Sequence, residues 1–385
     1  MFVMDRLNWP RSSGGDVHGS QMMRALAARG HRITLATFHR ITSEAIAGLG
    51  LANVVDLAAI PPADPTALRP ATRLQQRFER YWGTDPARQL AVASVTQSAD
   101  YDAVVILGAD ALPLFRGVRT GLRIWYAADD AALHHWSRLN VTDQNSWIHG
   151  RHAAVHALYE WAFAGIVDRV WVVSNVDRRA MRWFTGGVPV DLVPNGVDAE
   201  YFHPMPQKTE EIPCSCVFWG RLDFGPNEEA LRWFIEKIWK PLNFADSQFD
   251  VFGFRPTPEI VTLCRVPGVN LIPDLPDLRE EIGRRQVVVL PFISGRGIKN
   301  KLLEAAALGR PILATRQALI GAKGRVPVRV VVRPGDWASE LDRLFRDDAL
   351  RADLGRRARE WVLAHHSWDA AARAAEAGVF DGMTR

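Results

Sequence analysis

The sequence predicts an α/β protein built from two doubly wound parallel-sheet domains. The chain has 385 residues, too many for one ordinary domain, so two substantial cores are expected. Short runs of β-branched and aromatic residues alternate with longer amphipathic stretches, which is typical of parallel strands covered by helices on both faces. This alternating series occurs twice along the chain and therefore indicates one domain in each half.

The predicted strands are short and almost continuously apolar, as expected for strands buried on both faces. In the first half they lie at residues 1–4, 33–38, 103–107, 124–126, 170–173 and 190–193. In the second half they lie at residues 216–219, 250–254, 269–272, 287–292, 312–315 and 328–332.

Prolines and charged residues cluster in His203–Pro213, which favours a domain boundary there. We therefore expect an N-terminal domain over residues 1–203, a linker over 204–213 and a C-terminal domain over 214–366. Residues 367–385 are expected to form a helix that returns to the N-terminal domain.

Helix ends are visible in the second half of the chain. Asn227 is predicted to be an N-cap, because acidic residues follow it in the first turn. Another helix is predicted to open at Asn300 and to stop at Gly309, with Pro311 beyond it. The Arg- and Ala-rich stretch 351–377 is also predicted to be helical.

The composition is that of a folded globular chain, with 48% hydrophobic and 23% charged residues, and it excludes a disordered chain. No apolar run approaches the roughly 18 residues of a spanning helix, and the apolar stretch at the start is too short for a signal peptide. Three cysteines without a CxxC pattern favour a reducing compartment. A cytoplasmic location is the resulting expectation.

The chain is basic and rich in tryptophan, with a formal net charge of +4, a pI of about 9.1 and 14 tryptophans. Such a charge suits nucleic acid, a membrane surface or an anionic small molecule. The tryptophans suit a core, an interfacial belt or a stacking platform for sugar rings and bases.

Two glycine-containing loops each stand between a predicted strand and a predicted helix. Gly14 and Gly15 lie in the first, where backbone can approach a ligand and a helix N-terminus attracts phosphate; an ordinary surface turn is the alternative. The second loop, Ser294–Lys301, has two glycines and two lysines and predicts an anion cradle. The loop lacks the GxxxxGK[ST] spacing of a P-loop. It does not match GxGxxG either, because Asn300 stands where the third glycine should be. The alternative is a solvated basic loop.

A third candidate is Gly220–Arg221, at the end of a predicted strand, where a guanidinium could pair with a diphosphate through two hydrogen bonds.

Over nearly its whole length the chain resembles the retaining group-1 (family 4-like) glycosyltransferases of the GT-B fold. In that fold two Rossmann-like domains face a central cleft. The resemblance is carried by Gly14-Gly15, Arg29–Phe38, Asp168–Met181, the PNGVD run Pro194–Asp198, Gly220–Leu222 and, most specifically, Leu290–Thr315.

The resemblance implies that a nucleotide sugar binds in the cleft, mostly to the C-terminal domain. Glu304 would then hydrogen-bond the ribose hydroxyls, and Arg221, beside Gly220, would neutralise the diphosphate. The backbone amides of Gly295 and Gly297 would approach the sugar and phosphates. Gly14 and Gly15 would close on them from the other domain.

Three positions depart from the family pattern. Arg296 stands where many members have the first glutamate of a Glu-x7-Glu pair, and Pro226 stands where many have a lysine. We therefore predict that Lys299 or Lys301 contacts the diphosphate. Asp129, followed by Asp130, stands where many members have a histidine; these carboxylates either orient the acceptor hydroxyl or cap the following helix.

The nearby His134 and His135 are predicted to contact the acceptor. His149, His152 and His156 share one helix face at a spacing that zinc could use, but no carboxylate or cysteine completes the set. The resemblance also implies a metal-independent enzyme, so we expect no metal and no cofactor.

Six tryptophans of the N-terminal half, with basic residues between them, predict a surface that contacts anionic lipid at the inner face of a membrane: Trp125, Trp136, Trp147, Trp161, Trp171 and Trp183. Trp171 lies within an apolar strand and is expected in the core, as are about half of the other five. The basic stretch Arg343–Arg359 is expected to be a solvated helix face, so no nucleic-acid partner is expected.

Together with the resemblance, these observations predict transfer of sugar from a nucleotide-sugar donor to a glycan, lipid-linked or small-molecule acceptor, and the resemblance implies that the transfer is retaining. Its expected catalytic residues are Asp129, Asp130, Arg221 and Lys299, and no protein nucleophile is required. The alternatives are a sugar-nucleotide epimerase or hydrolase on the same fold, or a degenerate protein that binds a nucleotide sugar without turnover.

Overall fold

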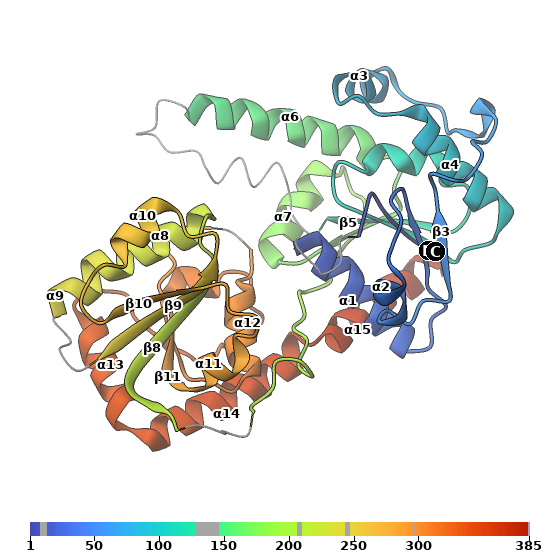
Figure 1. Ribbon diagram of the computed structural model, residues 1–385. Coiled ribbons are helices and arrows are strands. Elements are labelled where there is room, and N and C mark those ends of the chain that lie inside the picture. The colour runs from blue at the N-terminus through green and yellow to red at the C-terminus, as the bar shows by residue number, and fades with distance from the viewer. Residues whose placement is uncertain (8–13, 128–145, 206–209, 243–246, 296, 384–385) are drawn as a thin grey trace. The chain divides into compact units, whose positions relative to one another are not determined.

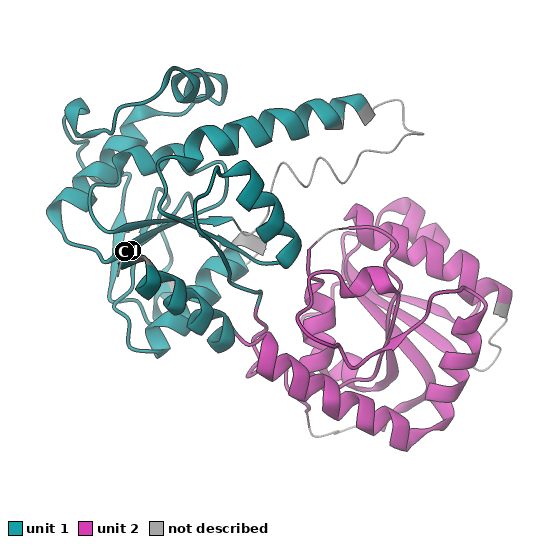
Figure 2. Ribbon diagram, turned by 180° about the vertical axis from the view of Figure 1, so that it is seen from behind, with its two compact units in different colours: residues 1–195, 368–385 teal, residues 196–367 magenta. Residues whose placement is uncertain are grey.

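The structure is a computed structural model that describes residues 1–7, 14–127, 146–205, 210–242, 247–295 and 297–383 (Figure 1). The chain divides into two compact units, Met1–Asn195 with Trp368–Arg385 and Gly196–Ser367 (Figure 2). The first unit thus ends at Asn195, whereas the predicted first domain ends at residue 203.

The first unit contains a seven-stranded parallel sheet in the order β3-β2-β1-β4-β5-β6-β7. The strands are β1 (Phe2–Met4), β2 (Thr34–Thr37), β3 (Asn53–Asp56), β4 (Ala103–Leu107), β5 (Leu122–Ala127), β6 (Arg169–Val172) and β7 (Val190–Leu192). All were predicted except β3. That strand lies at the sheet edge with partly exposed side chains, so its sequence lacks the continuous apolar run of its neighbours.

Helices cover both faces of this sheet. They are α1 (Gly14–Ala28), α2 (Ser43–Ala47), α3 (Arg73–Tyr81), α4 (Pro86–Ser98), α6 (Ser146–Ala164), α7 (Asn175–Phe184) and α15 (Trp368–Met383). Residues of α4 and α6 belong to one core cluster, and residues of α1 and α15 belong to another. The sheet therefore lies between two apolar layers. Helix α15 is held to α1 by ion pairs from Arg29 to Asp369 and Glu376.

The second unit contains a six-stranded parallel sheet in the order β10-β9-β8-β11-β12-β13. Its strands are β8 (Ile212–Arg221), β9 (Gln248–Phe254), β10 (Val269–Pro273), β11 (Arg285–Leu290), β12 (Ile312–Ala314) and β13 (Arg329–Val330). Its helices are α8 (Gly225–Phe234), α9 (Lys240–Leu242), α10 (Pro258–Leu263), α11 (Arg279–Gly283), α12 (Asn300–Ala307), α13 (Asp336–Arg346) and α14 (Asp348–His365).

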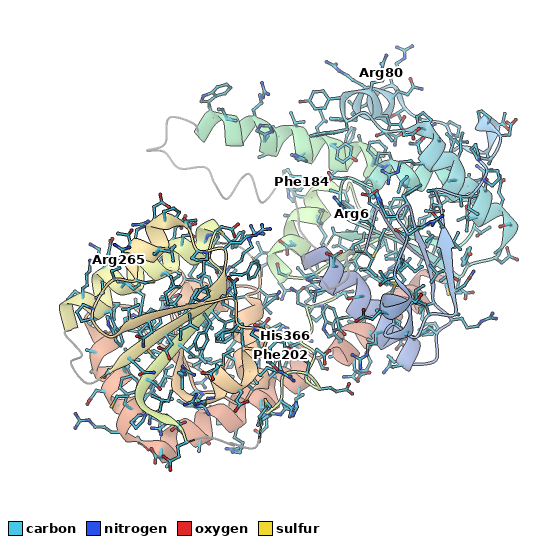
Figure 3. The ribbon with its side chains drawn as sticks, viewed as in Figure 1. Arg6, Arg80, Phe184, Phe202, Arg265 and His366 are labelled. Carbon is cyan, nitrogen blue, oxygen red and sulfur yellow. The ribbon has the colours of Figure 1, made fainter. Side chains whose placement is uncertain are left out.

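The helix predicted over 351–377 is in fact two helices, α14 and α15, interrupted at His366–Ser367. His366, labelled in Figure 3, is fully buried, and its carbonyl oxygen accepts a 2.7 Å hydrogen bond from the Val197 N–H. Its Nε2 accepts from the Lys323 N–H at 3.0 Å. These bonds draw the backbone into pairing with distant segments, which ends α14.

In each sheet the strand order reverses at the first strand, between β1 and β4 and between β8 and β11. Ligands of open parallel sheets bind at the carboxyl ends of the strands beside such a reversal. Two of the glycine-containing stretches singled out in the sequence follow β1 and β11, and the third, Gly220–Arg221, forms the end of β8. No helix in the described part of the chain is both long enough and apolar enough to span a bilayer.

Candidate functional site

The best-defined candidate site lies where β8 and β11 end. Gly220 has a φ of 139°, and a Cβ atom at this position would lie only 2.6 Å from Cε of Lys301. Real Cβ atoms do not approach a neighbour this closely, so a glycine is needed for the Lys301 side chain to lie against the end of β8.

Lys301 is held in this place by Asn227. Its Nζ donates to Asn227 Oδ1 at 3.1 Å, and Asn227 Nδ2 donates to the carbonyl oxygen of Arg221 at 2.7 Å. The ammonium also lies 5.4 Å from the ring centroid of Phe218, within cation–π range. Asn227, which is only 3% exposed, therefore links the end of β8 to α12.

The predicted N-cap role of Asn227 is wrong. Helix α8 begins at Gly225 with Phe224 as its N-cap, so Asn227 lies inside the first turn. Its side-chain amide instead donates to the Arg221 carbonyl oxygen and accepts from Lys301. The predicted opening of α12 at Asn300 and its stop at Gly309, whose φ is 66°, are confirmed.

Glu304 lies one helical turn beyond Lys301. The indole Nε1 of the buried Trp219 donates to Glu304 Oε2 at 2.8 Å. Burial raises the pKa of Glu304, while the Trp219 hydrogen bond and the positive charge of Lys301 act in the opposite direction. Within the described residues Oε1 has no hydrogen-bond partner, so one oxygen is oriented by the protein and the other can accept a ligand hydroxyl.

The two candidate lysines have different surroundings. Lys299 folds back on its own loop, where Nζ donates to the carbonyl oxygens of Gly295 at 2.7 Å and Gly297 at 3.3 Å. Lys301 instead reaches toward Gly220. Burial lowers the pKa of both lysines to about 8, and the charge of Lys301 adds to the effect on Lys299.

Gly295 and Gly297 have φ values of 86° and 73°, which suit glycine. A Cβ at Gly295 would lie 3.2 Å from Cβ of Pro226, so the two loops touch at this point. Pro226 stands where many related chains have a lysine. In this chain Pro226 lies in the first turn of α8 and packs against Gly295.

Arg221 lies on the accessible side of the site. Its side chain is 48% exposed, and its Nε lies 2.7 Å from Asp223 Oδ1. Asp223 was not anticipated from the sequence, although its position two residues after the arginine is a signal that could have identified it. Exposed ion pairs are weak, so the guanidinium can exchange this carboxylate for a phosphate at little cost.

Five predicted site residues lie outside the described residues: Asp129, Asp130, His134, His135 and Arg296. Gly14 and Gly15 were predicted in a loop, but they form the start of α1. One turn farther along α1, Nδ1 of the buried His18 lies 3.2 Å from the Tyr126 hydroxyl, a pair that sequence reasoning missed. Burial raises the pKa of Tyr126.

The His149 side chain lies outside the described residues, and among those that the structure describes no group of three His, Cys, Asp or Glu side chains is arranged to hold an ion. His156 instead packs against Trp82, with ring centroids 5.4 Å apart.

A known family model matches part of the second unit. Residues 213–347 match the family model described as "Glycosyl transferases group 1". A search of curated protein sequences found no match to the chain.

Solved structures resemble the chain over its whole length. Sucrose-phosphate synthase from Thermosynechococcus elongatus has a TM-score of 0.68 at 16% identity, covering 100% of this chain and 98% of that one. A glycosyltransferase from Rickettsia africae has 0.67 at 12%, covering 100% and 98%. Anabaena HepE in complex with UDP and glucose has 0.63 at 14%, covering 98% of each chain. The predicted two-domain GT-B fold is confirmed.

Proposed function

From a chain that has the GT-B fold and a group 1 glycosyltransferase segment at 213–347, we propose a retaining transfer of sugar from a nucleotide-sugar donor to a glycan, lipid-linked or small-molecule acceptor. The single observation that carries the donor assignment is the Lys301 ammonium held over Gly220, at the reversal between β8 and β11. Cations placed where a strand order reverses suit a phosphate-bearing ligand.

Lys301 and Arg221 bind the donor diphosphate in this proposal. As the bond from sugar to phosphate breaks, the departing nucleoside diphosphate gains negative charge. Fixed cations and backbone amides stabilise that charge more than the ground state and so lower the barrier. The backbone amides of Gly295 and Gly297 donate hydrogen bonds to the sugar and phosphates. Lys299 stabilises the loop that carries them by donating to the carbonyl oxygens of both glycines.

Glu304 binds the ribose hydroxyls through Oε1, while Trp219 holds Oε2. Glu304 is thus a donor-binding residue and not a catalytic base. Trp219 is a positioning residue, because it acts through the carboxylate.

Retention follows from same-face attack, in which the acceptor oxygen bonds to the anomeric carbon as the sugar–phosphate bond breaks. The acceptor proton passes to the departing phosphate, so no protein nucleophile is needed. Asp129, Asp130, His134 and His135 remain the proposed acceptor-side residues. Gly14 and Gly15 remain the proposed donor contacts of the first unit.

We also propose that transfer needs no divalent metal, since Lys301 and Arg221 supply positive charge at the diphosphate. Activity should persist when EDTA is present and should not rise when magnesium or manganese is added. Loss of turnover with EDTA, restored by either ion, would contradict this.

Two other functions compete with transfer. A sugar-nucleotide epimerase or hydrolase would use the same donor site. A degenerate protein would bind the donor without turnover, and Arg296, at a position where many related chains have a glutamate, keeps this reading open.

A panel of nucleotide sugars, each assayed with and without acceptors, separates these functions. UDP-glucose leads the panel, because Anabaena HepE has been solved in complex with it. Nucleoside diphosphate release that depends on an acceptor supports transfer, release without acceptor indicates a hydrolase, conversion to an isomeric nucleotide sugar indicates an epimerase, and binding without turnover indicates the degenerate protein. Anomeric configuration of the product, read by NMR, tests retention.

A further inference from the structure

Helix α6 presents a second apolar stripe to solvent. Its outward positions follow a spacing of four and three residues, which places them on one side of a helix. These positions are Trp147, Arg151, Ala154, Leu158 and Trp161. Trp147 is 66% exposed, Trp161 55% and Leu158 46%, while Tyr159 and Phe163 on the opposite side are buried in the core.

Helix α7 extends this surface. Trp183 is 88% exposed, and Arg179 and Arg182 beside it are also exposed. Nε1 of Trp161 lies 3.9 Å from where a Cβ would stand at Gly186, just after α7 ends, so the ends of the two helices are neighbours. We refer to Trp147, Arg151, Leu158, Trp161, Arg179, Arg182 and Trp183 as the Trp–Arg face, carried by the green helices α6 and α7 of Figure 1.

The arginines of the Trp–Arg face differ from two exposed arginines on α13 and α14 that are held in ion pairs. Arg151, Arg179 and Arg182 form no ion pair with any residue that the structure describes. On α13 and α14, by contrast, Arg346 pairs with Asp342 at 2.8 Å and Arg357 with Asp353 at 3.3 Å. Within the described residues, the charges of Arg151, Arg179 and Arg182 are therefore not compensated by an ion pair.

The acidic residues of the same two helices do not neutralise the Trp–Arg face. Glu160 of α6 is fully buried. Asp177 of α7 accepts a 2.6 Å hydrogen bond from the Ser174 hydroxyl at the start of the helix. The face thus combines exposed indoles, a leucine and unpaired guanidinium groups.

This combination fits an anionic lipid surface better than other occupants. Indole rings favour the headgroup region, because one edge is polar and the body is apolar. Guanidinium groups attract anionic headgroups. A second copy of the chain would bring these arginines against their own like charges, and nucleic acid would gain little from Leu158.

We propose that the Trp–Arg face of α6 and α7 docks the protein onto membranes that contain anionic lipid. The indoles of Trp147, Trp161 and Trp183 enter the headgroup layer, and Arg151, Arg179 and Arg182 pair with lipid phosphates. The inference does not depend on the transferase activity.

Co-sedimentation of the full chain with vesicles tests the proposal. Vesicles of phosphatidylcholine mixed with phosphatidylglycerol should bind the protein, and binding should weaken as salt is raised. Vesicles of phosphatidylcholine alone should bind at least tenfold less. The triple variant Trp147→Ser, Trp161→Ser, Trp183→Ser should bind anionic vesicles at least tenfold less than the unaltered chain.

A charge-reversal pair sharpens the test. Arg179→Glu with Arg182→Glu should weaken binding to anionic vesicles at least about tenfold, since each basic residue near the surface contributes about fivefold. Arg346→Glu with Arg357→Glu makes the same change in net charge on α13 and α14 and should alter binding less than twofold. All variants replace exposed side chains, so their unfolding midpoints should stay within a few degrees of the original.

Three results would overturn the proposal: no binding to anionic vesicles, equal loss in both charge-reversal pairs, or equal binding to the two kinds of vesicle. A stable dimer in sedimentation velocity that the tryptophan variant dissociates would assign the face to a second copy. Binding of duplex or single-stranded DNA that vesicles fail to compete would assign it to nucleic acid.

Discussion

The Nζ of Lys301 donates a 3.1 Å hydrogen bond to Oδ1 of Asn227, and this bond brings a cation from the start of α12 to the end of β8. The relationship gives Asn227 a definite place in the proposed donor site. It also predicts how substitutions and pH should change donor binding.

Replacing Lys301 by methionine should raise the KM for the nucleotide sugar by about 10- to 100-fold, because an ion-paired contact to the diphosphate is lost. The same change should raise the stability of the fold by roughly 1 kcal/mol, since a partly buried charge is removed. Steady-state kinetics and thermal unfolding measure the two effects. Lys237→Met, at an exposed position of the same unit, is the control and should change KM less than twofold.

Donor binding should weaken as the pH rises through about 8. The pKa of Lys301 is lowered to about 8 in the free protein, so its ammonium is charged below this pH and increasingly neutral above it. Bound diphosphate favours the charged form, and the loss should therefore appear in KM more than in kcat. A KM that stays constant from pH 7 to about 9.5, roughly a unit and a half above that pKa, would remove Lys301 from the donor site.

Asn227→Asp should move that alkaline loss of donor affinity to higher pH. A carboxylate at this position favours the charged form of Lys301 and raises its pKa. It also weakens affinity several-fold at neutral pH by repelling the diphosphate. Asn227→Ala should weaken affinity without such a shift to higher pH, and identical pH profiles for the two variants would contradict a positioning role.

Gly220→Ala should weaken donor binding about 10- to 100-fold, as Lys301→Met does, because an added methyl group would displace the Lys301 side chain and because a φ of 139° disfavours alanine. Gly225→Ala is a matched control, since a Cβ there meets nothing within 4 Å. Isothermal titration with the nucleotide sugar compares the two variants. If Gly220→Ala binds as tightly as the original chain, Lys301 does not lie over the site when the donor is present.

Trp219→Phe should weaken donor binding about three- to tenfold by removing the hydrogen bond that orients Glu304. Glu304→Gln should have the larger effect, since the ribose then loses a charged acceptor. In the double variant the loss should fall short of the product of the single losses. Independent effects would show that Trp219 supports the core only.

Much of the fold could be predicted because each central strand contains a short run of apolar residues, as in Ala103–Leu107. The edge strand Asn53–Asp56 could not, since half-exposed side chains leave no such signature. The break at His366 also escaped prediction, because the hydrogen bonds that end α14 come from Val197 and Lys323, far away in the sequence.

The sequence pattern identified the candidate site residues, but it could not predict which contacts each side chain makes. Lys299 and Lys301 are two residues apart in the sequence, yet one tethers its own loop and the other crosses to Gly220. That difference depends on where α12 begins and on the side chain of Asn227, from the first turn of α8. The sequence pattern around Lys299 and Lys301 shows neither the contact with Asn227 nor the direction in which each lysine side chain points.

The interruption at His366–Ser367 also has a consequence for biosynthesis. Ala371, Ala372 and Ala375 of α15 belong to the core of the first unit, whereas the second unit is a single uninterrupted segment, Gly196–Ser367. On the ribosome the later segment can be complete while the earlier one still lacks a helix. The order in which the two units mature is thus expected to run opposite to the order in which they are translated.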